Sequence, residues 1–299
     1  EHIDEDVLSE ISNEITGNIE DDTNSRSDWE EQYKGGLELL GMSYEDRSEP
    51  FEGASGIVHP LLAESVTQFQ AQAYREMLPA GGPVKTSIIG AETPEVTAQA
   101  ERVKNYMNYQ ITYEMEEYDP ELDQMLFYLP IVGSAFKKVY FDPTMQRAVS
   151  KFVHSEDLIV PYSATDLATA TRVTHCIRMD KNEIKKLQLS GFYRDIDLPS
   201  SGADSDGTND VKDTINDIEG ITSSSSQNEE MMIYEVHTDL DIEGFEDIGA
   251  DGEPTGLKMP YIVTIMEDTG DVLSIKRNFN ESDPLRRKVP YFVHYKFLP

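Results

Sequence analysis

A helical pattern closed at both ends by proline and glycine constrains the fold more than any other stretch of this chain. It runs from about residue 60 to residue 78, and its apolar residues recur at steps of three and four, which places them on one helical face: Leu62, Val66, Phe69, Ala73 and Met77. Pro60 suits the first turn, because its missing N–H would have no intrahelical partner there. The run from Pro79 to Pro83, which contains two glycines, ends the helix.

The opposite face of this predicted helix is rich in amides and mixed in charge. It carries Gln68, Gln72, Arg75 and Glu76, and no reactive group stands out among them. Such a face is either solvated or packed against another polar helix.

Helical patterns dominate the first half of the chain and strand patterns the second. Asp28 and Glu31 form a capping box for a helix that ends near Gly41. After the 60–78 helix, Thr93 caps a helix of about six turns, and Asp119 begins another. The helix after Thr93 repeats apolar residues on one face, which we expect to pack inward: Val96, Ala100, Val103, Met107, Ile111, Met115 and Tyr118. From residue 134 the period changes to that of strands, expected at 135–141, 146–153, 158–162, 171–179, 230–241, 259–267, 272–278 and 291–297. This order predicts the α+β class, with mostly antiparallel strands.

Two segments lack a clear pattern. Residues 1–27 are acidic, and we expect a poorly ordered N-terminal segment. Some of its apolar residues fall at near-helical spacing, so a short amphipathic segment that docks on a partner stays open as the alternative. Residues 195–227 are rich in Asp, Ser, Gly and Asn, which predicts a mobile insertion.

The charge balance limits the function. The chain of 299 residues holds 57 Asp and Glu against 25 Lys and Arg, a formal net charge of -32. Broad binding to nucleic acid through phosphate neutralisation needs clustered cations, so this balance argues against it. The single cysteine, Cys176, excludes an internal disulfide and favours a reducing, intracellular setting. No apolar run reaches the length of a membrane span, and no signal-peptide pattern opens the chain.

No motif predicts catalysis, a cofactor or a metal site. The most metal-like run has Asp239, Asp241 and Glu243 followed by a glycine, as in a calcium loop, but Ala250 stands where the bidentate carboxylate belongs. The histidines show no ligand spacing. The residues alone therefore favour a structural protein over an enzyme.

Three stretches are similar to one family. Each of them resembles part of the N-terminal region of portal proteins from short-tailed bacteriophages: residues 48–84 (SEPFEGASGIVHPLLAESVTQFQAQAYREMLPAGGPV), residues 129–139 (LPIVGSAFKKV) and residues 289–295 (VPYFVHY). The resemblance extends over roughly residues 28–299. It implies a wing-like domain with a helical part at 28–133 and a mostly β part at 134–299, and it places the stem, clip and channel helices beyond residue 299.

The resemblance also implies a function. Portal proteins form a ring, usually of twelve subunits, at one vertex of the phage head, through which double-stranded DNA is packaged and ejected without sequence specificity. The expected partners are further copies of the chain, the terminase motor, the major capsid and scaffolding proteins and a tail adaptor, and no membrane. The ring does not hydrolyse ATP; it assembles in the host cytoplasm and stays in the virion.

Two groups of residues become candidates for subunit contact on this interpretation. The first is the polar helical face with Gln68, Gln72, Arg75 and Glu76, and the second is the basic run of Arg286, Arg287 and Lys288, which could neutralise acidic neighbours or touch a phosphate backbone. Two alternatives stay open: a metal-dependent hydrolase that uses clustered carboxylates, and a monomeric acidic adaptor.

Overall fold

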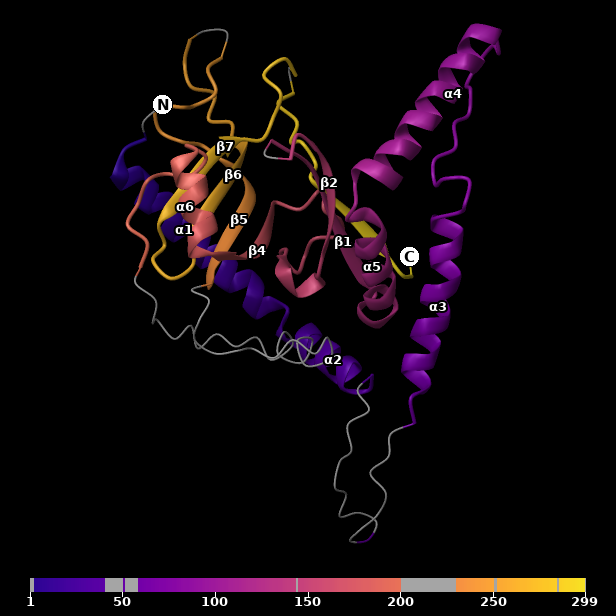
Figure 1. Cartoon of the computed structure of the whole chain (residues 1–299). Coiled ribbons are helices and arrows are strands. Elements are labelled where there is room, and N and C mark those ends of the chain that lie inside the picture. Colours follow the sequence, from indigo (N-terminus) through magenta and orange to yellow (C-terminus); the bar gives the residue numbers. More distant parts are fainter. Residues whose placement is uncertain are drawn as a thin grey trace. The chain divides into compact units, whose positions relative to one another are not determined.

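The chain is an α+β protein whose helices and strands form two compact units, seen in a computed structural model (Figure 1). The structure describes residues 3–40, 51, 59–143, 145–199, 230–249, 252–283 and 285–298. The first unit consists of residues 1–34 and 156–290, and the second of residues 35–155 and 291–299.

The first unit is built on a five-stranded antiparallel sheet with the strand order β3-β4-β5-β6-β7. Its strands are β3 (Leu158–Ile159), β4 (Arg172–Asp180), β5 (Glu230–Leu240), β6 (Met259–Met266) and β7 (Val272–Arg277). Pairings such as Val236 with Val263 run along the central strands, and Gly270 takes a positive φ in the turn between β6 and β7. The strands lie close to the ranges that the sequence predicts.

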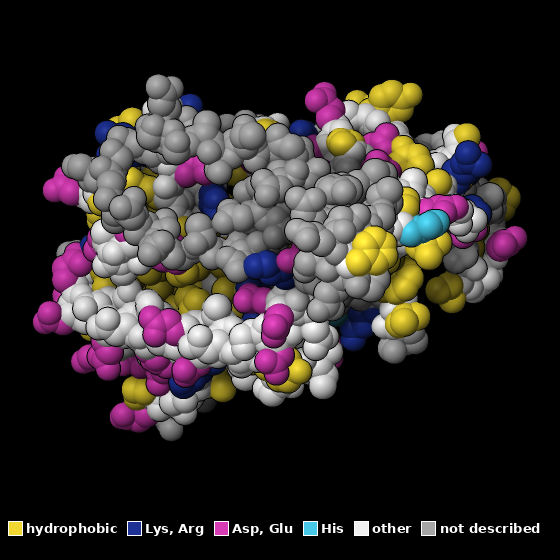
Figure 2. All heavy atoms as spheres, turned by 90° about the horizontal axis from the view of Figure 1, so that it is seen from below, with side chains coloured by type: hydrophobic (Ala, Val, Ile, Leu, Met, Phe, Trp, Pro, Cys, Tyr) yellow, Lys and Arg dark blue, Asp and Glu magenta, His cyan; other side chains and the backbone are white. Residues whose placement is uncertain are grey.

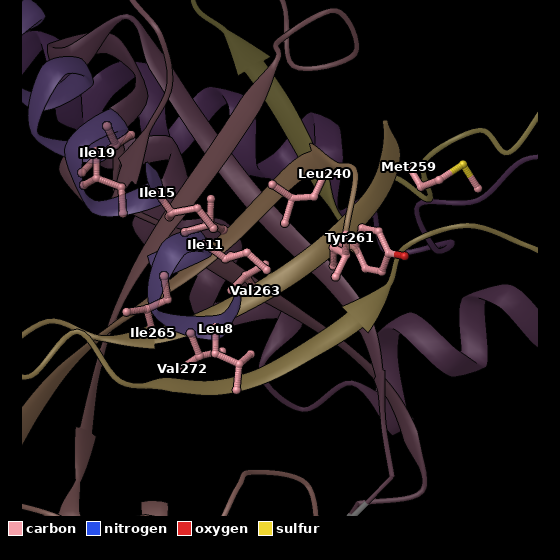
Figure 3. Close-up of a cluster of buried hydrophobic side chains, with 13 residues drawn as sticks. Leu8, Ile11, Ile15, Ile19, Leu240, Met259, Tyr261, Val263, Ile265 and Val272 are labelled. Atoms are coloured by element: carbon pink, nitrogen blue, oxygen red, sulfur yellow. The ribbon is translucent and has the colours of Figure 1, made fainter. Parts of the chain in front are cut away.

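Helix α1 (Glu5–Ser25) covers one face of this sheet. Its apolar side chains point toward the sheet in Figure 3 and share one buried cluster with the strands: Leu8, Ile11, Ile15, Ile19, Val236, Val263, Ile265 and Val272. The expectation of a poorly ordered N-terminal segment was therefore wrong. The apolar residues of α1 are few, but all of them meet one face of the sheet, and their burial stabilises the helix. The acidic composition alone is typical of a poorly ordered segment.

A bidentate ion pair fixes the end of α1 to the sheet. Asp22 accepts hydrogen bonds from Arg172 at the start of β4, from Nε at 2.5 Å and from Nη2 at 2.8 Å, and the Asp22 carboxylate is almost fully buried. Just beyond the helix, Arg26 donates to the carbonyl oxygens of Glu156 and Leu158. Helix α2 (Ser27–Glu38) follows.

Helix α6 (Lys181–Leu189) lies against the opposite face of the same sheet. The Asp180 carboxylate caps its N-terminus by accepting from the Asn182 N–H. Ile184 of the helix is fully buried with Met231 and Ile233 of β5. Since alternate residues of a strand face opposite sides, Ile233 and Val236 supply the two separate cores of this unit.

The second unit joins helices to a three-stranded antiparallel sheet with the order β2-β1-β8. The strands are β1 (Ser134–Asp142), β2 (Arg147–Val153) and β8 (Phe292–Lys296). The helices are α3 (Leu61–Met77), α4 (Pro94–Tyr109) with a π-helical extension η1 (Gln110–Glu114), and α5 (Tyr118–Val132). Gly133 ends α5 in the left-handed conformation, with φ of 82°.

Helix α5 forms the centre of the second unit. Leu122, Met125, Leu126 and Leu129 are buried in it, and residues of α3, β2 and β8 pack around them, including Phe69, Phe152 and Tyr295. This cluster confirms the predicted inward face of the 60–78 helix.

A buried charged group lies where α5 meets β1 and β2. Lys137 of β1 is 1% exposed, its Nζ lies 4.1 Å from the centre of the Tyr118 ring, and it has no hydrogen-bond acceptor among the described residues. Burial lowers the pKa of Lys137 to about 8, although the charges of Glu121 and Glu117 act in the opposite direction. A lysine in this position is charged at neutral pH at a cost in stability.

The same two carboxylates cover the open edge of the sheet. Glu117 accepts from the Ser150 N–H at 3.1 Å, and Glu121 accepts from the Phe152 N–H at 2.6 Å, so these two outward N–H groups of the edge strand β2 are satisfied. Arg147 donates to Glu117 at 2.6 Å. Burial opposes ionisation of Glu117, but the hydrogen bonds from backbone N–H groups and from Arg147 outweigh it and lower its pKa. Capping of this kind protects an edge strand from pairing with another chain.

The helical part at 28–133 and the mostly β part at 134–299, expected as parts of one wing-like domain, are not the two compact units of the structure. A boundary after residue 133 would separate helices from strands, whereas each compact unit contains both. The reason is that β8 returns from the end of the chain to pair with β1, while α1 from the beginning of the chain packs on the β5–β7 strands. Of the expected insertion at 195–227, residues 200–227 lie outside the described part of the chain.

Candidate self-association surface

The polar face of α3 is exposed, which is one of the two arrangements that the sequence left open. Gln68, Gln72, Arg75 and Glu76 all lie on the solvent side of the helix, opposite the face that packs on α5. Gln68 makes one weak contact within the helix, in which its amide donates to Glu64 at 3.3 Å. The structure thus brings these four candidates together on one accessible surface.

Polar contacts fix α3 on α5 and so hold that surface in place. The Gln70 amide donates to the side-chain carboxylate of Asp123 at 2.9 Å and to its backbone oxygen at 3.2 Å. The Tyr74 hydroxyl donates to Asp119 at 2.5 Å, and this hydrogen bond, together with burial, raises the pKa of Tyr74. These bonds are exposed, so they orient α3 more than they stabilise it.

The basic run at residues 286–288 belongs to the first unit and does not form a patch of free cations. Arg286 donates to the backbone oxygen of Glu281 at 2.6 Å, and Arg287 pairs with Asp283 at 2.8 Å. Lys288 donates to the backbone oxygens of Leu167 and Ala170, at 3.3 Å and 3.0 Å, so it fastens a loop of its own unit.

The ion pair between Arg287 and Asp283 shifts the pKa of both side chains. Its hydrogen bond lowers the pKa of the Asp283 carboxyl, and the same bond raises the pKa of Arg287. With all three cations bonded within the chain, this run is a weaker candidate for subunit contact than the α3 face.

Helix α4 carries a surface that the sequence did not identify as exposed. Its apolar residues were expected to pack inward, but none of the α4 side chains is buried, and α4 makes no extensive contact with α3, α5 or either sheet. Figure 1 shows α4 extending away from α5. We call the exposed set the α4 face: Val96, Val103, Tyr106, Met107, Tyr109 and, from η1, Tyr113.

A side-chain clamp holds α4 on its other side. Asn108 accepts from the Val84 N–H at 2.9 Å and donates to the Val84 carbonyl at 3.2 Å, which imitates the pairing of two backbone strands. Gly82, with φ of 89°, brings the loop against the helix, and a Cβ at this position would lie 2.5 Å from the Asn108 Oδ1. The clamp ties the loop after α3 to α4 and leaves the α4 face open.

The helical segment that carries both surfaces is nearly neutral. Residues 59–114 contain six Glu, no Asp and four Lys or Arg, a net charge of -2, so the rest of the chain carries -30 of the total of -32. On the face drawn in Figure 2, acidic side chains are spread over the described surface, and Lys and Arg are sparse. Contact between two copies of so acidic a chain costs least where the charge is lowest.

Within the part of the chain that the structure describes, no group of three or more His, Cys, Asp or Glu is placed to hold a metal ion. In the calcium-like run, Asp241 and Glu243 are exposed while Ile242 between them is buried, and Ala250 lies outside the described residues. None of the described helices combines the length and apolar character needed to span a bilayer.

Comparison with known proteins gives no assignment: no family model matches the chain, and no curated protein is significantly similar to it.

Proposed function

We propose that this chain is the wing portion of a bacteriophage portal protein, a subunit of a ring at the head vertex through which DNA is packaged and ejected. The proposal starts from the three stretches that resemble portal proteins, at 48–84, 129–139 and 289–295. The described part of the chain adds an observation that supports it.

That observation is the way in which the three stretches meet. They lie far apart in the sequence, yet α3 of the first, the α5–β1 junction of the second and β8 of the third belong to one buried cluster, with Phe69, Leu129, Ala135 and Tyr295 in contact. β1 and β8 are also paired, with Ala135 opposite Tyr295. Matches that arose by chance would have no reason to share one core, so the resemblance concerns one structural unit.

The acidic balance supports the same proposal on physical grounds. A channel through which DNA slides must avoid tight phosphate contacts, because each Lys or Arg contact adds a salt-dependent hold on the duplex. A chain with a net charge of -32 supplies few such contacts. The basic run at 286–288, which is bonded within its own unit, adds none of the free cations that a DNA-binding surface needs.

The test is the assembly state of the purified chain. Mass photometry and negative-stain imaging at micromolar concentration should show rings with a central hole, and a twelve-subunit ring of the 33.8 kDa chain would have a mass of about 406 kDa. A uniform monomer over the whole concentration range contradicts the proposal and favours the acidic adaptor. Unfolding temperatures that rise with added magnesium or manganese would favour the hydrolase instead.

A further inference from the structure

We infer that the α4 face is the surface through which one copy of this chain contacts a second copy. This inference rests on the proposed ring function and names the contact that function requires. It differs from the expectation drawn from the sequence, which placed subunit contact on the polar face of α3.

The α4 face is continuous. Val96, Val103 and Met107 recur at steps of seven and four, so they form one row along the helix, and each is about 40% exposed. A second row, made of Tyr106, Tyr109 and Tyr113, adjoins the first; Tyr106 and Tyr109 are more than half exposed and Tyr113 is 74% exposed.

Two of the three tyrosines stack on each other, and the third is hydrogen-bonded within the helix. The rings of Tyr109 and Tyr113 stack with their centres 5.7 Å apart, and the Tyr106 hydroxyl accepts a hydrogen bond from the Gln110 amide at 3.3 Å. Tyrosine contributes a large contact area at a low entropy cost, and it is enriched at the centres of protein interfaces.

The rest of the described chain does not supply a cover for this face. α4 is held by the Asn108 clamp and by its continuation into η1, and it packs extensively on no other helix or strand. Most of the stability of a protein helix comes from burying its apolar face, so a helix of 16 residues with that face in water is marginal. A contiguous apolar patch of this kind marks an interaction site.

Charge identifies the partner as a second copy. A nucleic acid would need clustered cations, but the α4 helix has only Arg102 and Lys104, offset by Glu95 and Glu101. A strongly basic partner would prefer the acidic surfaces that carry the remaining charge of the chain. A partner with a net charge of -32 is repelled everywhere except where the surface is close to neutral and apolar, and the segment at 59–114, with a net charge of -2, is such a surface.

The experiment compares two substitutions that add the same charge to opposite sides of α4. Met107→Glu places a carboxylate in the middle of the α4 face. Thr97→Glu is the control, because Thr97 is exposed and lies three turns before Asn108 on the clamp side of the helix, away from the α4 face. Tyr113→Glu is a second variant within the face, and because Tyr113 is highly exposed, the substitution leaves the core of the protein unchanged. Circular dichroism and thermal unfolding establish that each variant is folded.

The readout is the fraction of assembled protein against concentration, measured by mass photometry and sedimentation velocity. We expect Met107→Glu and Tyr113→Glu to raise the concentration needed for assembly at least tenfold, since a carboxylate would have to be buried against an apolar surface. Thr97→Glu should assemble like the wild type.

The outcomes separate this inference from the proposed function. If the wild type and the two face variants all form rings at the same concentration, the α4 contact is refuted and the ring stands. If the wild type forms only dimers and Met107→Glu abolishes them, the contact stands and the ring is refuted. A wild type that stays monomeric throughout refutes both.

Discussion

Replacing the buried lysine of β1 by methionine should make the protein more stable at neutral pH, and the gain should shrink as the pH rises. Lys137→Met keeps the length of the side chain and removes an ammonium group that is 1% exposed and has no hydrogen-bond acceptor among the described residues. A buried charge of this kind is replaced by an apolar residue of similar volume at little cost or with a gain in stability.

The size of the effect follows from the pKa of Lys137, which burial lowers from 10.5 to about 8. The folded state therefore releases a proton more readily than the unfolded state, so the wild type gains stability as the pH rises between about 8 and 10.5. At pH 7 the penalty on the charged lysine is about 3 kcal/mol, and at pH 9.5 it falls to about 1 kcal/mol. The advantage of Lys137→Met should thus decline by about 2 kcal/mol between these two pH values.

Urea denaturation at pH 7 and pH 9.5, followed by circular dichroism, measures this difference. Burial raises the pKa of the neighbouring Tyr118 and Tyr295, and their effect on stability at high pH is shared by wild type and variant, so it cancels in the comparison. Lys151→Met, at an exposed position on β2, is the matched control and should show no such change with pH. A stability difference between wild type and Lys137→Met that is the same at both pH values would refute the account of this site.

Two further substitutions test the packing of each unit. Ile15→Ala removes a side chain that is 3% exposed between α1 and the sheet, so chemical denaturation should show a free energy of unfolding lower by about 2–5 kcal/mol. Glu14→Ala, on the exposed side of α1, should change it by no more than about 0.5 kcal/mol. Equal effects of the two substitutions would mean that α1 is not part of the core. Gly82→Ala puts a residue with a side chain in the left-handed region and against the Asn108 amide, so we expect it to lower the unfolding temperature. Gly81→Ala is the control and should leave the unfolding temperature unchanged, because a Cβ there meets nothing within 4 Å. An unchanged unfolding temperature for Gly82→Ala would show that the clamp is dispensable.

Local patterns in the sequence predicted most elements of this fold, with α1 as the exception. The period of three and four in 60–78 and the Thr93 cap before α4 are encoded by neighbours in the chain, and the structure has helices at both places. The change to a period of two after residue 134 likewise predicted the strands and the α+β class. Such features depend on backbone geometry and capping, which act over a few residues.

The sequence could not decide which apolar faces would be buried. α1 and α4 both have apolar residues at helical spacing, and composition favoured α4 as the packed helix. The structure reverses this, because the residues of α1 meet the β5–β7 strands, while those of α4 meet no other helix or strand extensively among the described residues. The signal that could have identified α1 was the spacing from Val7 to Ile15, and for α4 it was the run of three tyrosines beside the aliphatic row.

The sequence by itself determined most of the elements, the fold class and the acidic charge, since these depend on residue type and short spacing. Only the tertiary structure decided how β8 returns to β1, how Lys137 comes to be buried beside Glu117 and Glu121, and which cations are already paired. It also decided that the α4 face is left open. These features depend on contacts between residues far apart in the chain, and such contacts form only when the folded chain brings those residues together.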